Sequence, residues 1–214
     1  LPGTDSPFNI NAISQVNGGF TTGGTGWYRK TFTILPELKG KSFRIRFDGA
    51  YMNSDIWLNG QYIGNHPYGY SSFWFDITKK LSFDDKNVIA VKVKNEGENS
   101  RWYSGSGIYR HVWLEILPPV HIGTWGTYIT TPVITKDEAE VRIETAIENE
   151  SSENKTLKLI TTVIDKNSRQ VAQTESPVNT EAGNSFSSVQ QIRILNPELW
   201  DTETPVLYRA ISGI

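Results

Sequence analysis

Residues 42–48 read Ser-Phe-Arg-Ile-Arg-Phe-Asp, and this stretch decides the fold class. Three apolar residues, Phe43, Ile45 and Phe47, alternate with the charged residues Arg44 and Arg46. A period of two places the apolar side chains on one face of a strand and the charged side chains on the other. The stretch therefore predicts a β-strand that is half buried.

Similar short alternating stretches recur through the first half of the chain. They cover residues 27–34, 55–58, 73–77, 88–93 and 112–116. Asn59-Gly60 predicts a tight hairpin turn between residues 55–58 and 61–63, because both residue types tolerate a positive φ. No segment shows a period of 3.6 over the length of a helix, so the sequence predicts an all-β protein.

Pro118-Pro119 interrupts this pattern, because proline cannot donate a backbone hydrogen bond within a sheet. Beyond the prolines, Val141, Ile143, Thr145 and Ile147 alternate toward a predicted inner face, and residues 148–155 form a predicted polar loop. Further strands are predicted at 156–165, 169–173, 185–194 and 206–211. We therefore predict two domains, 1–118 and 119–214, each a β-sandwich with its own core.

Composition excludes several classes of function. The 214 residues include no cysteine, which rules out disulfides and thiolate chemistry, and the formal charge of −2 gives no attraction to nucleic acid. No apolar run approaches the roughly 18 residues of a membrane span. The first residue is not Met and no signal peptide is present, which suggests an excised segment; the compartment stays open, with an exported or periplasmic location slightly favoured.

No complete catalytic or metal site can be recognised from residue spacing. The carboxylates, such as Glu144 and Glu148, lie on polar strand faces or in loops and are expected to be solvated. His66, His111 and His121 show no ligand spacing. The sequence therefore predicts no catalytic residue, no metal and no cofactor.

Residues 99–110 stand apart as a candidate binding segment. Arg101, Trp102 and Tyr103 combine a guanidinium group with two aromatic rings, close to flexible glycines. Aromatic rings stack on the apolar faces of sugars, and guanidinium groups make paired hydrogen bonds. These three residues are the predicted substrate-binding residues, although a structural role in plugging the sandwich stays open. For Ile108, Tyr109 and Arg110 the structural role is preferred.

Three stretches carry a resemblance to the family 2 glycoside hydrolases, the group of the β-galactosidases and β-glucuronidases. They are Gly-Trp-Tyr-Arg-Lys-Thr-Phe at 26–32, the run that ends in Asp-Ile-Trp-Leu-Asn-Gly at 47–60, and Trp-Tyr-Ser-Gly-Ser-Gly-Ile-Tyr-Arg-His-Val-Trp-Leu at 102–114. The remainder, with Asn-Pro-Glu-Leu-Trp-Asp at 196–201, is similar to the immunoglobulin-like domain that follows in that family.

The resemblance implies a jelly-roll (galactose-binding-like) sandwich, then an immunoglobulin-like sandwich, then a TIM barrel with both catalytic glutamates. The parent is then expected to be a retaining, β-galactosidase-like enzyme of carbohydrate breakdown. The present chain is expected to be inactive alone, to help complete the pocket for a β-galactoside or related glycoside, and to support its own barrel. Arg101 stands where classical members place an aspartate near the substrate, which leaves the sugar open.

Two alternatives remain at this stage. A free-standing carbohydrate-binding module requires an exposed aromatic platform. A structural or adhesive array of β-sandwiches predicts buried Trp102 and Tyr103 and no ligand.

Overall fold

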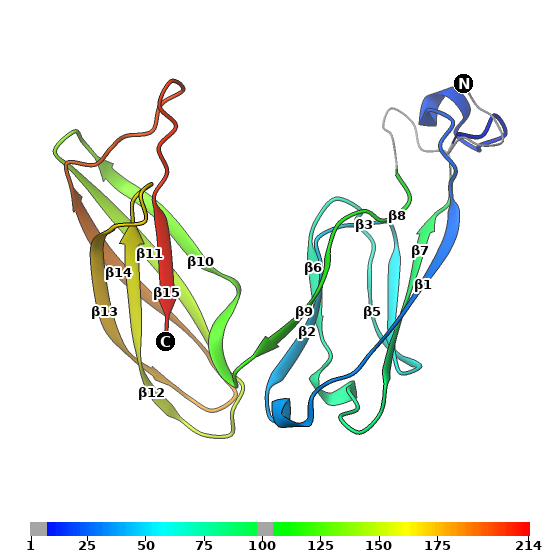
Figure 1. The fold of residues 1–214 in the computed structure, drawn as a ribbon, viewed down its shortest axis with the longest axis horizontal. Coiled ribbons are helices and arrows are strands. Elements are labelled where there is room, and N and C mark those ends of the chain that lie inside the picture. Colours follow the sequence, from blue (N-terminus) through cyan, green and yellow to red (C-terminus); the bar gives the residue numbers. More distant parts are fainter. Residues whose placement is uncertain (1–7, 98–104) are drawn as a thin grey trace. The chain divides into compact units, whose positions relative to one another are not determined.

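A computed structural model of the chain describes residues 8–97 and 105–214. Within these ranges the regular structure is all strand apart from three short 3₁₀ helices, which confirms the all-β prediction. The chain divides into two compact units, Leu1–Leu117 and Pro118–Ile214, coloured blue to green and green to red (Figure 1). Each unit has a core of its own.

The first unit contains two main antiparallel sheets, with strand orders β1-β7-β4-β5 and β6-β2-β9, and a short pair, β3-β8. The strands are β1 (Gly24–Phe32), β2 (Ser42–Phe47), β3 (Ala50–Tyr51), β4 (Ser54–Leu58), β5 (Gln61–His66), β6 (Phe73–Asp76), β7 (Asn87–Asn95), β8 (Gly107–Ile108) and β9 (Val112–Leu117). Apolar side chains from both sheets pack into one core, in which Phe43, Phe47, Ile56 and Leu58 are fully buried.

The stretch that decides the fold forms β2, with Phe43, Ile45 and Phe47 in the core as predicted. The prediction that the charged face of this strand is exposed to solvent is wrong for Arg44. Arg44 is only 3% exposed, and its guanidinium lies 4.3 Å from the centre of the Trp74 ring. An aromatic ring beside the strand thus covers a face that periodicity alone assigned to solvent.

The predicted hairpin at Asn59-Gly60 is confirmed. Both residues have positive φ, 52° and 78°, and Leu58 pairs directly with Gln61. The Asn59 side chain also accepts a hydrogen bond from the Val88 backbone N–H and donates one to Asn87 Oδ1. The turn is therefore tied to the start of β7 as well as closing its own hairpin.

The second unit contains two three-stranded sheets, with strand orders β10-β11-β14 and β13-β12-β15. Its strands are β10 (Val120–Ile134), β11 (Glu138–Asn149), β12 (Lys155–Ile164), β13 (Gln170–Thr180), β14 (Ser185–Leu195) and β15 (Arg209–Gly213). Along β11 the inner face predicted from alternation is confirmed, since Val141, Ile143, Thr145 and Ile147 are all buried.

Three strands of the second unit differ most from the prediction. β10 was not predicted, because Gly123, Gly126 and Pro132 interrupt its alternation and two register shifts bend it. β13 runs through Pro177, which an edge strand tolerates. β15 begins at Arg209 rather than at residue 206.

An apolar hollow lies at the surface of each unit. In the first unit a hollow of about 390 Å³ lies between β1 and β9, lined by side chains that include Tyr28, Val112 and Leu114. In the second, a hollow of about 270 Å³ is lined by residues that include Trp200 and Leu207. Within the described ranges, no helix has the length and apolar character needed to cross a membrane.

Candidate functional site

The predicted binding residues Arg101, Trp102 and Tyr103 lie outside the described residues. The structure does define the two chain segments that lead into and out of this stretch. β7 precedes it and β8 follows it, and both strands belong to the first unit. The candidate site is therefore built from the residues that flank segment 98–104.

One polar chain ties the two flanking segments together. Asn95, the last residue of β7, is 3% exposed, and its side-chain Nδ2 donates a 2.8 Å hydrogen bond to Ser106 Oγ. Ser106 Oγ in turn donates to the Thr22 carbonyl oxygen at 3.1 Å. Asn95 and Ser106, which flank segment 98–104 in the chain, are thus held close to each other and to Thr22.

Gly107 fits its position for two reasons. Its φ is +107°, which residues with a side chain rarely adopt, and an added Cβ would lie 2.3 Å from the Tyr28 hydroxyl oxygen. That hydroxyl accepts a 3.4 Å hydrogen bond from the Ile108 backbone N–H. Close packing of Tyr28 against this glycine therefore sets the path of the chain as it leaves segment 98–104.

Tyr51, Tyr68, Tyr70 and Tyr109, here called the tyrosine cluster, lie next to these flanking segments. Tyr51 pairs with Gly107 across β3 and β8, and its ring centre lies 5.1 Å from that of Tyr70. The Tyr68 and Tyr70 rings are 5.8 Å apart. Tyr68, Tyr70 and Tyr109 are 60%, 54% and 44% exposed, so their rings can reach a ligand in solvent.

Close backbone approaches hold the cluster in place. Tyr109 Oη donates a 2.7 Å hydrogen bond to the Gly69 carbonyl oxygen, and its ring packs where a side chain on Gly49 would lie. A Cβ on Gly69 would come within 2.1 Å of the Tyr51 ring. Tyr109 therefore has the structural role expected for it, while still exposing part of its ring.

Two groups in and beside the cluster have shifted pKa values. Burial raises the pKa of the Tyr70 hydroxyl, and the neighbouring Tyr51 raises it further. Burial lowers the pKa of His66, whose ring stacks on Phe73 at 4.1 Å and whose Nε2 lies 3.0 Å from Ser71 Oγ. The Arg110 guanidinium lies 5.7 Å from the centre of the Tyr109 ring. The cluster thus presents hydroxyls and ring faces beside a cation, groups that suit a sugar.

A second aromatic surface, which sequence reasoning missed, lies on the β1-β7-β4-β5 sheet. It consists of Trp27, Trp57 and Tyr62 and is here called the tryptophan stripe. The ring centre of Trp57 lies 5.2 Å from that of Trp27 and 5.5 Å from that of Tyr62. Trp27 and Tyr62 are 54% and 50% exposed. Trp27 pairs with Lys92, and Lys92 with Asp55, so charged groups border the rings.

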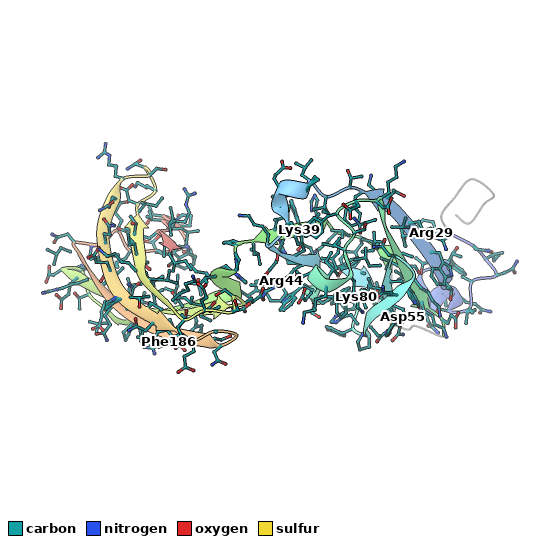
Figure 2. The ribbon with its side chains drawn as sticks, turned by 90° about the horizontal axis from the view of Figure 1, so that it is seen from below. Arg29, Lys39, Arg44, Asp55, Lys80 and Phe186 are labelled. Atoms are coloured by element: carbon teal, nitrogen blue, oxygen red, sulfur yellow. The ribbon has the colours of Figure 1, made fainter. Side chains whose placement is uncertain are left out.

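Asp55 organises the polar border of the stripe (labelled in Figure 2). Its Oδ1 accepts hydrogen bonds from Asn65 Nδ2 at 2.9 Å and from the Tyr62 hydroxyl at 3.3 Å. Alternation in residues 55–58 and 27–34 could have placed Trp27 and Trp57 on outward faces. Only the strand order β1-β7-β4-β5 shows that they lie on the same surface.

Neither apolar hollow has the pair of carboxylates that glycoside hydrolysis uses. The described lining of the hollow in the first unit has no Asp or Glu, and that of the second unit has Glu198 alone.

Two successive antiparallel β-sandwiches, the first with exposed aromatic rings on its surface, define the class as a tandem β-sandwich protein. Family models then give the particular family. The sugar binding domain of the glycosyl hydrolases family 2 matches residues 6–118, and a second model of the glycosyl hydrolases family 2 matches residues 120–214. The chain belongs to this family, which confirms the resemblance seen in the sequence.

Individual relatives carry two enzyme names. A β-galactosidase of Bacteroides ovatus is 46% identical over 98% of this chain, and a β-glucuronidase of Formosa agariphila is 34% identical over 89%. The chain spans only 25% and 22% of the lengths of these two relatives. A crystal structure of a family 2 member from Bacteroides cellulosilyticus superposes with a TM-score of 0.93 at 47% identity, covering 99% of this chain and 27% of that one.

Proposed function

We propose that this chain is the non-catalytic N-terminal region of a retaining, β-galactosidase-like glycosidase. Its first unit helps to complete the substrate pocket, and both units support a catalytic barrel formed by other residues of the parent protein. Family membership and the names of the relatives support the glycosidase assignment. The substrate is a β-galactoside or a related glycoside.

The observation that supports the pocket-completing role is the hydrogen bond between the two residues that flank segment 98–104. Asn95 and Ser106 are joined by their side chains, and the exposed tyrosine cluster lies beside them. Loops between the strands of a rigid sandwich commonly carry binding residues. We propose that Arg101, Trp102 and Tyr103 contact the sugar from this segment.

Arg101 is the residue expected to influence the choice of sugar. A guanidinium group donates paired hydrogen bonds to neighbouring hydroxyls and binds a carboxylate especially well. Because β-galactosidases and β-glucuronidases both occur among the relatives, a neutral sugar and an anionic sugar are the two substrates to compare.

The test is steady-state kinetics of the parent enzyme carrying Arg101→Ala, on chromogenic β-galactoside and β-glucuronide. We expect kcat/KM on the preferred substrate to fall about 10- to 150-fold, the equivalent of one charged hydrogen bond of about 1.5–3 kcal/mol. The melting temperature should not change. Arg169→Ala, on a turn of the second unit, is the matched control and should leave kcat/KM unchanged. Unfolding of Arg101→Ala with normal kinetics of the folded fraction would show a structural role instead.

The tryptophan stripe favours a second candidate function, direct carbohydrate binding by the isolated chain. Exposed, adjacent aromatic rings with hydrogen-bonding neighbours form the platform that a carbohydrate-binding module needs. Affinity electrophoresis in gels containing soluble β-linked polysaccharides tests this function. Retardation that is lost in Trp27→Ala and kept in Trp125→Ala would support it, and equal mobility with and without polysaccharide would exclude it for those polymers.

A further inference from the structure

His121, at the start of β10, has a hydrogen-bond partner at one ring nitrogen, Nδ1, and none at the other, Nε2, among the described residues. The residue is only 4% exposed, and Nδ1 lies 2.9 Å from the Pro118 carbonyl oxygen. A carbonyl oxygen can only accept, so Nδ1 carries a hydrogen and donates it. In the neutral ring Nε2 is then a lone-pair acceptor, and this atom is buried without a hydrogen bond in the described part of the chain.

Nε2 nevertheless faces a carboxylate. Glu148 is the direct cross-strand partner of His121 in the β10–β11 pair, and its Oε2 lies 3.2 Å from Nε2. A lone pair and a carboxylate oxygen at this distance repel each other unless a positive charge lies with them. Either a proton on Nε2 or a bound cation can supply that charge.

Glu150 adds a third ligand to the same place. One ligand atom from each of His121, Glu148 and Glu150 lies within 4.8 Å of the others. The two glutamates flank Asn149, which is 1% exposed and whose side chain donates a 2.9 Å hydrogen bond to the Glu153 carbonyl oxygen. Because Asn149 faces inward, the alternation of the strand turns both glutamates to the opposite side.

The backbone around these three residues is fixed by pairing. The Glu150 N–H donates a 2.8 Å hydrogen bond to the Pro119 carbonyl oxygen, which continues the β10–β11 ladder past Val120. A Cβ on Gly123 would lie 2.6 Å from Glu148 Oε1, so a side chain at this position would displace the carboxylate from where it lies. Gly123 stands in the register shift between Ile122 and Thr127, and such bulges commonly adjust the aim of side chains at functional sites.

We propose that His121, Glu148 and Glu150 bind a divalent first-row transition-metal cation, with Zn²⁺ as the best match. One imidazole nitrogen and two carboxylate oxygens are ligands that Zn²⁺ accepts, and water can complete a tetrahedron. Histidine ligands of metals commonly donate their other ring N–H to a backbone carbonyl, as Nδ1 does to Pro118. The cation fastens β10 to β11 immediately after Pro118-Pro119 and has a structural role.

The experiment titrates ZnCl₂ into the EDTA-treated and dialysed chain of 214 residues by isothermal calorimetry, with thermal melting as a second readout. We expect one site, and a melting temperature that rises by several degrees at a large excess of Zn²⁺ over Kd. Glu148→Gln and Glu150→Gln should each raise Kd at least tenfold. Glu144→Gln, which removes a charge from the same face of β11, should leave Kd unchanged.

Stability without metal separates a bound cation from a protonated histidine. In Glu148→Gln the new amide can donate a hydrogen bond to the Nε2 lone pair, so the metal-free variant should melt at or above the temperature of the metal-free wild type. An imidazolium–carboxylate ion pair with no role in metal binding predicts a lower melting temperature of the metal-free variant, because the substitution would remove its anion, and that result together with no stabilisation of the wild type by Zn²⁺ would overturn the proposal.

Two calorimetric results would also overturn it. One is the absence of Zn²⁺-dependent heat and stabilisation. The other is equal Zn²⁺ affinity in the wild type and Glu148→Gln together with a loss in His111→Gln, which would assign the binding to an exposed histidine of the first unit.

Discussion

Asn95 and Ser106 are joined by a side-chain hydrogen bond of 2.8 Å, although eleven positions separate them in the chain. This bond closes the stretch that contains all three predicted sugar-binding residues. It connects the end of β7, an inner strand of its sheet, to the residue before β8, so the two described flanks of this stretch are attached to the same sandwich.

The first prediction concerns this bond. Asn95→Ala should destabilise the first unit by about 1–3 kcal/mol, because it removes a buried amide and leaves its partners without it. Urea unfolding followed by tryptophan fluorescence measures the effect, since five of the seven tryptophans precede Pro118. Asn179→Ala, at an exposed position of β13, should change stability by less than about 0.5 kcal/mol. Equal losses in the two variants would contradict the assigned role of Asn95.

The second prediction compares Gly105 and Gly107, the two glycines that follow segment 98–104. Gly107→Ala should destabilise the first unit by about 1–3 kcal/mol, because φ is +107° and the new Cβ would meet the Tyr28 hydroxyl. Gly105→Ala should be tolerated, since no atom of the described residues beyond its chain neighbours lies within 4 Å of its added Cβ. Denaturation curves of the two variants, recorded under one set of conditions, decide the matter. A tolerated Gly107→Ala would show that Tyr28 does not fix the chain here.

The third prediction concerns Asp201 in the second unit. Backbone N–H groups of Thr204 and Glu203 donate to its Oδ1 at 2.6 Å and 2.8 Å, and these bonds, those of Thr204 first, lower the pKa of the carboxyl group. A pKa lowered by folding stabilises the folded state above the ordinary value of 3.8, and this contribution disappears as the pH falls through the folded pKa.

Asp201→Asn should therefore lower the urea midpoint at pH 7, and the difference from wild type should shrink as the pH falls below about 4. Asp84→Asn, in the first unit, serves as the control for a general change of charge. A difference between Asp201→Asn and wild type that stays constant from pH 7 to pH 2.5 would refute the linkage.

Much of the fold follows from short-range pattern. Period-two alternation identified β2 and β11, and Asn59-Gly60 identified the hairpin, because each of these signals is contained within a few residues. β10 was not predicted, because its glycines and bulges disrupt the alternation, although it pairs with β11 as a strand. The burial of Arg44 was not predicted either, because the ring that covers its side chain belongs to Trp74, 30 positions further along the chain.

For the candidate sites too, sequence predicts what is local and does not predict contacts between distant residues. The segment with Arg101 has an unusual local composition, so sequence could point to it. The tryptophan stripe and the His121–Glu148 contact join residues that are 30 and 27 positions apart, and nothing in their spacing indicates proximity. Strand order and register are needed to bring them together.

The measurement that tests the central claim most directly is hydrolysis of a chromogenic β-galactoside by the isolated chain of 214 residues, assayed beside the parent enzyme. We expect the chain to release chromophore at the rate of a protein-free blank and the parent enzyme to release it rapidly. Turnover by the chain that persists through repurification to constant specific activity would contradict the claim that this region is non-catalytic.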